Sequence, residues 1–293
     1  MTLKQKPKWL KMEMPGTGHY PEIKRLLQEK NLNTVCSSAR CPNIGDCWSR
    51  RTATFMILGA RCSRNCRFCA IEHGRLHPPD AEEPLRVAQA VQTLKLRYAV
   101  VTSVTRDDLP DGGAGHFNAT ILAIRLLNPQ CLIEVLIPDL QGDTQSLDFI
   151  LAARPDVLNH NLETVRRLYC TVRPQADFDR SLKVMHHASM KGFVTKSGMM
   201  LGLGESGAEV LEAAEALRSA GCRILTLGQY LAPSKEHLPV ARYLPPEEFA
   251  HLRQQCLRLG FDHVQAGPMV RSSYHAAEQS VNRRESAKQH GGL

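Results

Sequence analysis

Residues 54–69 read TFMILGARCSRNCRFC, a short apolar run followed by three closely spaced cysteines. The run Thr54 to Leu58 is made almost entirely of large apolar and β-branched side chains, which is typical of a buried strand. The cysteines begin four residues later, at Cys62, with the spacing C-x3-C-x2-C. This stretch therefore predicts a strand that carries a cysteine-rich loop at its carboxyl end.

Further apolar runs follow along the chain and alternate with amphipathic segments. The predicted strands are 54–58, 98–104, 132–136, 157–159, 194–201 and 224–227, and the predicted helices are 85–94, 116–127, 144–153, 181–191 and 208–220. Regular alternation of strand and helix predicts a parallel α/β sheet. Nearly continuous apolar strands fit burial on both faces, which leaves a barrel and a doubly wound sheet both open.

Polar or glycine-containing segments follow several of these strands. In both architectures, ligand sites gather at the carboxyl ends of the strands. Each segment alone is explained by ordinary turn chemistry, but their joint occurrence favours a ligand-binding rim. The segments contain Thr102, Ser103, Thr105, Arg106, Asp107 and Asp108; Asn159, His160, Asn161 and Glu163; and Gly202, Gly204 and Glu205.

The length of 293 residues allows one large domain or two ordinary ones. Apolar residues make up 43% and charged residues 23%, which excludes a disordered chain, and no apolar run approaches the ~18 residues of a membrane span. We expect an N-terminal extension over 1–50, a barrel-like unit over 51–260, and a C-terminal extension over 261–293 with a polar tail from His275. The net charge of +8 favours an acidic partner or simply a solvated basic surface.

Ten cysteines are present, and six of them lie between Cys36 and Cys69. They form two triplets, Cys36, Cys41 and Cys47, then Cys62, Cys66 and Cys69. Structural zinc normally takes four protein ligands, whereas three thiolates on one loop can hold three corners of a [4Fe-4S] cluster and leave the fourth iron open. Two iron-sulfur clusters are favoured, with zinc and redox-sensing thiols as alternatives. We interpret Cys131, Cys170, Cys222 and Cys256 as small buried side chains.

The second triplet, with Phe68 directly before its last cysteine, resembles the signature of the radical S-adenosylmethionine (SAM) superfamily. CSSARCPNIGDCW, residues 36–48, and VRSSYHA, residues 270–276, are similar to lipoyl synthases. Further stretches that match this family are TSVTRDDLPDGGA from Thr102, NHNLETV from Asn159, KSGMMLGLGE from Lys196 and HLPVARY from His237. The likeness runs from about Tyr20 to Ala276.

The resemblance implies a partial (β/α)6 TIM-type barrel and the insertion of two sulfur atoms at carbons 6 and 8 of an octanoyl chain on a lysine of a lipoyl carrier domain. Those carbons bear no acidic proton, so acid-base catalysis cannot act on them and a cofactor must supply a radical. The implied cofactors are SAM and two [4Fe-4S] clusters. In the family, one cluster binds and cleaves SAM, and the auxiliary cluster donates the sulfur.

The resemblance also assigns residues. Cys62, Cys66 and Cys69 would hold the SAM-binding cluster. Cys36, Cys41 and Cys47 would hold the auxiliary cluster with Ser272 as its fourth ligand, and Ser273 is the alternative. An oxygen ligand should bind iron less firmly than a fourth thiolate, which suits a cluster that gives up sulfide. Lys196, Gly202 and Glu205 are weaker candidates for contacts with SAM.

The implied partners are octanoylated carriers, namely the lipoyl domains of 2-oxo acid dehydrogenases and the H protein of glycine cleavage. A low-potential donor, ferredoxin or flavodoxin, and a cluster-repair protein are also implied. We expect no nucleic-acid or membrane partner, and a cytoplasmic location, because residues 1–16 show neither a secretory signal nor a transit peptide. The alternatives are a biotin synthase-like enzyme, a tRNA methylthiotransferase, or a non-catalytic metal or electron-transfer module.

Overall fold

The computed structural model describes residues 7–10, 18–49, 52–274, 276 and 278. Residues 1–6 and 11–16, on which the expectation of no targeting signal largely depends, lie outside this range. So does nearly all of the predicted polar tail from 275 to 293. No helix within the described residues combines the length and apolar character that a membrane crossing requires.

The main sheet contains seven parallel strands and one short antiparallel strand at its edge, in the order β1-β2-β5-β6-β7-β8-β9-β10. The parallel strands are β2 (Thr54–Ile57), β5 (Tyr98–Ser103), β6 (Leu132–Leu136), β7 (Val157–Asn159), β8 (Val194–Leu201), β9 (Ile224–Gln229) and β10 (His263–Gly267), and the antiparallel strand is β1 (Asn33–Thr34). The small strands β3 (Arg61–Cys62) and β4 (Glu72–His73) pair only with each other.

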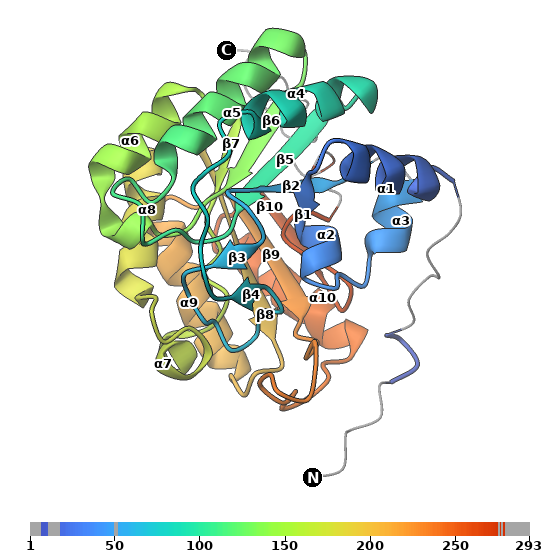
Figure 1. Ribbon diagram of the computed structural model, residues 1–293. Coiled ribbons are helices and arrows are strands. Elements are labelled where there is room, and N and C mark those ends of the chain that lie inside the picture. Colours follow the sequence, from blue (N-terminus) through green and yellow to red (C-terminus); the bar gives the residue numbers. More distant parts are fainter. Residues whose placement is uncertain (1–6, 11–17, 50–51, 275, 277, 279–293) are drawn as a thin grey trace, which may run out of the picture.

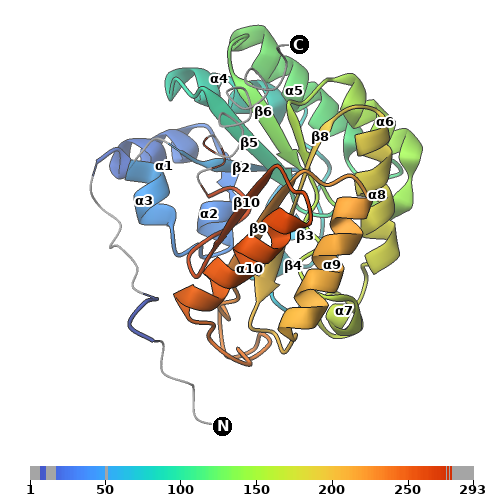
Figure 2. The same cartoon turned by 180° about the vertical axis from the view of Figure 1, so that it is seen from behind.

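Helices follow the first six parallel strands and cover the outer side of the curved sheet (Figures 1 and 2). They are α4 (Glu83–Thr93), α5 (Ala114–Leu127), α6 (Thr144–Ala152), α8 (Phe178–Met190), α9 (Gly207–Ser219) and α10 (Pro246–Arg258). The short segments are α7 (Tyr169–Val172) and the 3-10 turns η1 (Leu140–Gly142) and η2 (Arg166–Leu168). Six strand-helix units in sequence confirm the predicted α/β class and partial barrel.

Local sequence determines where the helices start. Ser206 and Glu209 form a reciprocal capping box at α9, and Asp143 and Asp177 accept hydrogen bonds from the first turns of α6 and α8. The strands are buried because helices pack on one side and the site lies on the other. All four residues of β2 are buried, as are all six of β9.

Three helices precede the barrel and lie beside the β1–β2 edge of the sheet (Figure 1). These are α1 (Tyr20–Glu29), α2 (Val35–Ser38) and α3 (Ile44–Ser49). Sequence periodicity did not predict them, nor α10. Strands β1 and β10 fall in the ranges predicted as extensions, 1–50 and 261–293, yet both pair with the main sheet.

One prediction about the isolated cysteines is wrong. Cys131, Cys222 and Cys256 are buried, as expected, but Cys170 is exposed. It lies in the short helix α7, which turns Tyr169 and Val172 inward and leaves Cys170 on the outer side.

Candidate functional site

A cavity of about 480 Å³ lies at the carboxyl ends of the parallel strands. Its walls come from the ends of β2, β5, β6, β7, β8 and β9, from the N-terminal helices, and from the segment 270–274 after β10. The predicted cluster ligands that line it are Cys36, Cys41, Cys47, Cys62, Cys66, Cys69 and Ser272, together with Ser273. The fold thus brings two triplets and a serine more than 200 residues later in the chain to one space.

The loop of the second triplet is fixed to the barrel by Arg64. Its guanidinium donates to both carboxylate oxygens of Asp107, at 2.6 and 2.9 Å, and to Asp139 Oδ1 at 2.6 Å. Arg64 and Asp139 are buried. Ser63 Oγ adds a bond to the Thr105 carbonyl and accepts one from the Asp107 amide, both 3.0 Å long. Bidentate, buried contacts of this kind hold a loop in one geometry.

Burial makes two of these thiols, those of Cys66 and Cys69, poor acids when they carry no metal. Desolvation raises the pKa of Cys66, and it raises that of Cys69 to about 12. The nearby Arg173 guanidinium acts in the opposite direction on Cys66. Since only the thiolate ligates metal, the loop needs a strong positive charge to ionise its cysteines. Iron bound at the loop would supply that charge.

The first triplet is held by the N-terminal helices and by the chain after β10. The Cys41 amide donates to the Cys36 carbonyl at 3.0 Å, and the Cys47 amide donates to the Asn43 carbonyl at 2.9 Å. Asn43 Nδ2 donates to the Met269 carbonyl at 2.7 Å, which ties this loop to the segment that carries Ser272.

The thiols of the first triplet are shielded from water as well. Burial raises the pKa of Cys36 to about 11, with Cys41 as a second cause, and burial also raises that of Cys41. Arg271 partly offsets the shift at Cys41. The thiols of Cys36 and Cys41 therefore also need positive charge to ionise.

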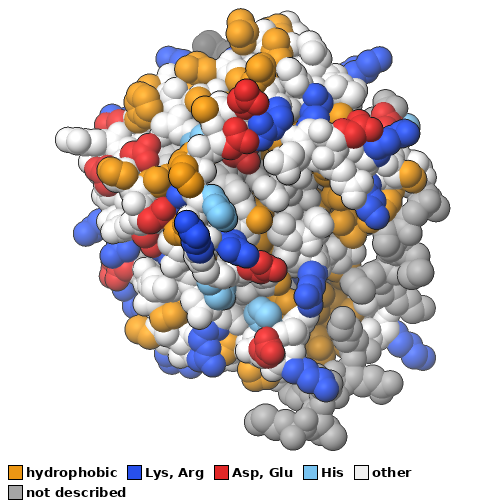
Figure 3. All heavy atoms as spheres, viewed as in Figure 1, with side chains coloured by type: hydrophobic (Ala, Val, Ile, Leu, Met, Phe, Trp, Pro, Cys, Tyr) orange, Lys and Arg blue, Asp and Glu red, His pale blue; other side chains and the backbone are white. Residues whose placement is uncertain are grey.

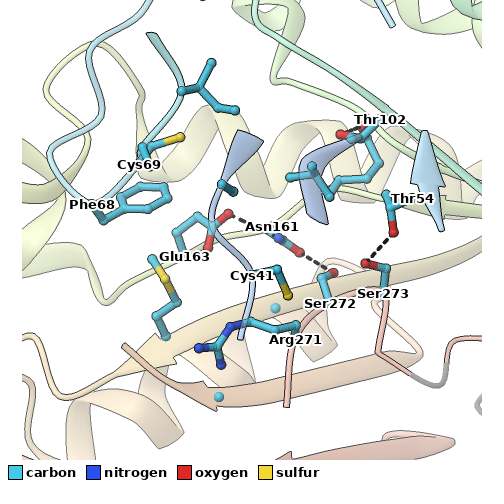
Figure 4. Close-up of a pocket in the computed structure, with 18 of the residues that line it drawn as sticks. Cys41, Thr54, Phe68, Cys69, Thr102, Asn161, Glu163, Arg271, Ser272 and Ser273 are labelled. Carbon is cyan, nitrogen blue, oxygen red and sulfur yellow. Dashed lines mark hydrogen bonds between the residues drawn. The ribbon is translucent and has the colours of Figure 1, made fainter. Parts of the chain in front are cut away.

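Ser272 and Ser273 point in different directions (Figure 4). Ser272 Oγ accepts from Asn159 Nδ2 at 2.8 Å and donates to Asn161 Oδ1 at 2.9 Å. Ser273 Oγ accepts from Thr54 Oγ1 at 2.9 Å, on the side of β2. Both serines line the cavity, and the two are distinguished by their partners.

The three residues suggested for SAM contacts lie outside the cavity lining that the structure describes. Lys196 is fully buried and forms a 3.0 Å ion pair with Glu134. The Glu205 carboxylate accepts from the backbone amides of Gly202 and Leu203, at 2.6 and 2.9 Å, and so closes the turn after β8. All three residues therefore stabilise the barrel itself, through an ion pair and a turn, and do not line the cavity.

Arg173 and Arg271 line the cavity but were not among the predicted site residues. Arg173 is buried, and its Nη1 donates to the carbonyls of Asn161 and Leu162. Arg271 lies beside Cys41 (Figure 4). Arg173 stands in no pattern that singles it out, because its proximity to the cysteines arises only in the folded chain. Arg271 directly precedes Ser272 in the segment that is similar to lipoyl synthases. They place one positive charge near each triplet.

Two polar side chains of the rim segment after β7 also face the cavity. His160 Nδ1 contacts the Ile137 carbonyl at 2.9 Å, and its buried Nε2 has no hydrogen-bond partner among the described residues. Burial lowers the pKa of His160 to about 4, with Arg173 as the next cause. Burial raises the pKa of Glu163. An unpaired buried acceptor in a cavity fits a site that receives a polar ligand.

No three His, Cys, Asp or Glu side chains in the described part of the chain converge on a single metal ion. A [4Fe-4S] cluster takes its thiolates at separate iron corners, and the six thiols lie around one cavity instead. With a cation near each triplet to offset the negative charge of a cluster, the residues present fit two such groups. The orphaned His160 acceptor and Arg173 fit a polar ligand that bears a carboxylate, such as SAM, beside the second triplet.

Sequence profiles match the chain over most of its length. The family described as the radical SAM superfamily matches residues 56–226, and the N-terminal domain of lipoyl synthase of the radical SAM family matches residues 2–41. The lipoyl synthase of Rubrobacter xylanophilus is 54% identical over 284 residues, covering 96% of this chain and 88% of that protein. That of Chlorobium phaeovibrioides is 53% identical over 277 residues, covering 94% and 98%.

Solved structures share the fold at low identity. Methylornithine synthase superposes with a TM-score of 0.53 at 13% identity, over 85% of this chain and 83% of that one. Streptococcus suis SuiB bound to S-adenosylmethionine gives 0.57 at 9% identity, over 72% of this chain and 49% of that one. These likenesses support the barrel fold alone.

Proposed function

The chain belongs to the lipoyl synthase family of radical SAM enzymes, and from this premise we propose how its own residues serve that activity. The family inserts two sulfur atoms into an octanoyl chain carried by a lipoyl domain, and it uses SAM and [4Fe-4S] clusters. The observation that carries our assignment is the meeting of both cysteine triplets and Ser272 in one cavity.

Cys62, Cys66 and Cys69 hold the cluster that binds SAM. Three thiolates leave one iron free of protein ligands, and the anchored Arg64 keeps the loop from shifting toward that iron. Arg173, beside Cys66, offers its charge to a ligand carboxylate, and the neutral His160 Nε2 offers an acceptor. These two residues replace Lys196, Gly202 and Glu205 as our candidates for contacts with SAM.

Cys36, Cys41 and Cys47 hold the auxiliary cluster, with Ser272 at its fourth corner. Ser272 is favoured over Ser273 because its oxygen lies between Asn161 of the cavity wall and the buried Asn159, whereas Ser273 is directed at Thr54 (Figure 4). When bound, the two clusters and SAM supply the radical chemistry and the sulfur atoms.

The protein itself supplies an apolar enclosure for the acyl chain. Most of the exposed area of the cavity wall is apolar, which suits an octanoyl chain and excludes water from reactive groups. The apolar residues at the strand ends include Met56, Val104, Leu136, Met199, Leu231 and Val270. An extended lysine arm could then deliver the chain between the two triplets.

The carrier docks on the basic surface around the second triplet. Arg61, Arg67 and Arg75 are exposed on the loop that contains β3 and β4, with Lys235 on a neighbouring loop. The Leu238 amide donates to the Arg67 carbonyl, which joins the two loops. Basic and histidine side chains gather over this part of the molecule (Figure 3). Such a surface would steer an acidic carrier domain to the cavity.

The finer partners follow from the reaction. A lipoyl domain of a 2-oxo acid dehydrogenase or the H protein of glycine cleavage presents the octanoyl-lysine, and ferredoxin or flavodoxin provides low-potential electrons. Sulfur donation consumes the auxiliary cluster, so a cluster-repair protein must rebuild it. We place these encounters in the cytoplasm.

The test is anaerobic incubation of the reconstituted protein with SAM, a reductant and an octanoyl-lysine peptide, followed by mass spectrometry. We expect a product in which two sulfurs have replaced two hydrogens. The variant Cys41→Ala, which removes a ligand of the auxiliary cluster, should cleave SAM but add no sulfur. Absence of any sulfur-containing product from the parent protein would contradict the proposed reaction. Only the assignment to the radical SAM superfamily would then remain.

A further inference from the structure

The hydroxyl of Ser272 is held from two sides by one short segment. Asn159, at the end of β7, donates to it at 2.8 Å, and Asn161, two residues later, accepts from it at 2.9 Å. The Asn161 contact is drawn in Figure 4. The position of this oxygen is therefore set by the barrel, although Ser272 lies in the segment after the last strand.

Behind Asn159 lies a buried charged pair. The same Nδ2 that contacts Ser272 also donates to Glu134 Oε1 at 2.8 Å, and Glu134 pairs with Lys196 Nζ at 3.0 Å. Glu134, Asn159 and Lys196 are each 0% exposed. A buried ion pair gives little net stability compared with an apolar replacement, but it can enforce a geometry.

The strand register brings these side chains together. Asn159 on β7 is aligned with Leu136 on β6 and with Lys196 on β8, and Glu134 is two residues before Leu136. Residues two apart on a strand point to the same face, so all three polar groups face the interior of the barrel. This placement explains why a lysine in a buried strand lies so close to the cavity without lining it.

The direction of every hydrogen bond in this chain is fixed by carboxylates. Glu134 accepts from Asn159, so the atom of Asn159 that faces Ser272 is the same Nδ2. At the other end, Asn161 Nδ2 donates to Glu163 Oε1 at 3.1 Å, which turns its Oδ1 toward Ser272. Ser272 Oγ must therefore accept from Asn159 and donate to Asn161.

Two glycines let the serine segment approach the barrel this closely. A Cβ on Gly228 would meet the Val270 carbonyl oxygen at 2.1 Å, and a Cβ on Gly198 would meet Asn161 Oδ1 at 3.0 Å. Larger residues at these positions would push the serine segment or Asn161 out of place.

We propose that Lys196, Glu134 and Asn159 form a positioning relay that aims Ser272 at the first cysteine triplet, while Asn161 stabilises the same hydroxyl when it is not bound to iron. The inference rests on the proposed role of Ser272 as a cluster ligand. A metal-bound serine oxygen can still accept from Asn159, but once its proton is lost it cannot donate to Asn161. The two asparagines therefore support opposite states of the serine.

The experiment measures how fast iron leaves the anaerobically reconstituted full-length protein in the presence of an iron chelator and without substrate. Mössbauer spectra follow the two clusters separately, so the cluster of the second triplet is an internal reference. Asn159→Ala should lose first-triplet iron more than about tenfold faster, as expected for one hydrogen bond to a charged oxygen. Asn161→Ala should lose it no faster than the parent.

Tyr98→Phe is the matched control, because Tyr98 donates to Glu134 Oε2 at 2.7 Å and not to the Oε1 that accepts from Asn159. It should leave the rate unchanged. Asn161→Ala is expected to fold normally, because Asn161 is only partly buried and lies at the cavity wall. This variant therefore shows whether the loss of a contact to Ser272 is by itself enough to accelerate iron loss. A circular dichroism melt confirms that each variant is folded.

The outcomes separate the two proposals. If Ser272→Ala leaves the rate of iron loss unchanged, the serine is not a ligand and its place in the proposed function is wrong. If Ser272→Ala accelerates the loss but Asn159→Ala does not, the relay alone is overturned.

Three further results would also overturn the relay. The first is that Asn159→Ala misfolds. The second is that Asn161→Ala or Tyr98→Phe accelerates the loss of iron as strongly as Asn159→Ala does. The third is that both clusters are lost together. In the Ser272→Cys background, Asn159→Ala should have no effect on the rate.

Discussion

The two cysteine triplets occupy the same cavity but are supported in different ways. The second is fixed to the loops after β5 and β6 through the ion pairs of Arg64 with the partly buried Asp107 and the fully buried Asp139. The first lies between N-terminal helices and the segment after β10, and its ties to the barrel are neutral hydrogen bonds such as Asn43 to Met269. Under the proposed assignment, the charged support belongs to the cluster that persists, and the neutral support belongs to the cluster that gives up its sulfur.

The largest expected effect comes from removing the second triplet. The triple variant Cys62→Ala, Cys66→Ala and Cys69→Ala should hold about half the iron of the parent, since each cubane contains about four irons. It should cleave no SAM and make no product. Iron analysis and SAM-cleavage assays check this result. An unchanged iron content would mean that the two triplets are not separate sites.

The second-largest effect is expected from removing Arg64, which anchors the loop of the second triplet. Arg64→Ala leaves Asp139 buried without its main partner, which costs about 3–5 kcal/mol of unfolding free energy. The exposed pair Arg166–Asp179 offers a matched control, and Arg166→Ala should cost at most ~1 kcal/mol. Urea unfolding measures both values. Equal losses in the two variants would show that the anchor is not special.

The third prediction concerns pH. The pKa of His160 is lowered by burial from 6.5 to about 4. The imidazole is therefore protonated near pH 6.5 in the unfolded chain but stays neutral at that pH in the folded protein. The stability that depends on neutral His160 is thus complete above pH 6.5 and is lost as pH falls toward 4. At about 1.4 kcal/mol per pH unit, the loss approaches roughly 3 kcal/mol.

Urea unfolding of the cluster-free protein between pH 7 and 4 measures this dependence. The variant His160→Gln should flatten that part of the curve. A parent curve that is already flat over this range would contradict the buried, neutral state of His160.

A smaller effect distinguishes the two serines of the first site. Ser273→Ala removes one hydrogen bond to Thr54, worth about 1 kcal/mol of stability, and should leave the iron content and the sulfur yield close to those of the parent. Ser272→Ala should reduce the sulfur yield far more. The reverse ranking would transfer the ligand role to Ser273.

The smallest effect is expected at Cys170, which is exposed and belongs to neither triplet. Cys170→Ser should change the unfolding free energy by less than about 0.5 kcal/mol and leave the iron content unaltered. Thermal unfolding and iron analysis check both points. A loss of iron in this variant would mean that cluster binding is not confined to the six clustered cysteines.

Sequence periodicity predicted six of the parallel strands and five of their helices, because buried strands and amphipathic helices have distinct apolar periods. It missed α10 and β10, which continue the sheet into the range predicted as an extension. Spacing located the cysteine triplets and polar rim segments, since their residues are close in sequence. It could not locate Arg173 at the cavity, because folding alone brings this residue near the second triplet.

Lys196 shows that sequence alone can also suggest the wrong role for a residue. Its position at the start of a matching motif suggested a contact with SAM, but the strand register pairs it with Glu134 inside the barrel. The sequence shows a lysine within a buried strand, but only the folded structure shows that its ammonium pairs with Glu134.

The central claim is that each triplet leaves one iron of a [4Fe-4S] cluster without a cysteine ligand. Combined iron analysis and Mössbauer spectroscopy of oxygen-free protein, recorded with and without SAM, test it most directly. We predict about eight irons per chain and a change at one site of one cluster when SAM is added. About four irons, bound zinc, or a spectrum unaffected by SAM would contradict the claim.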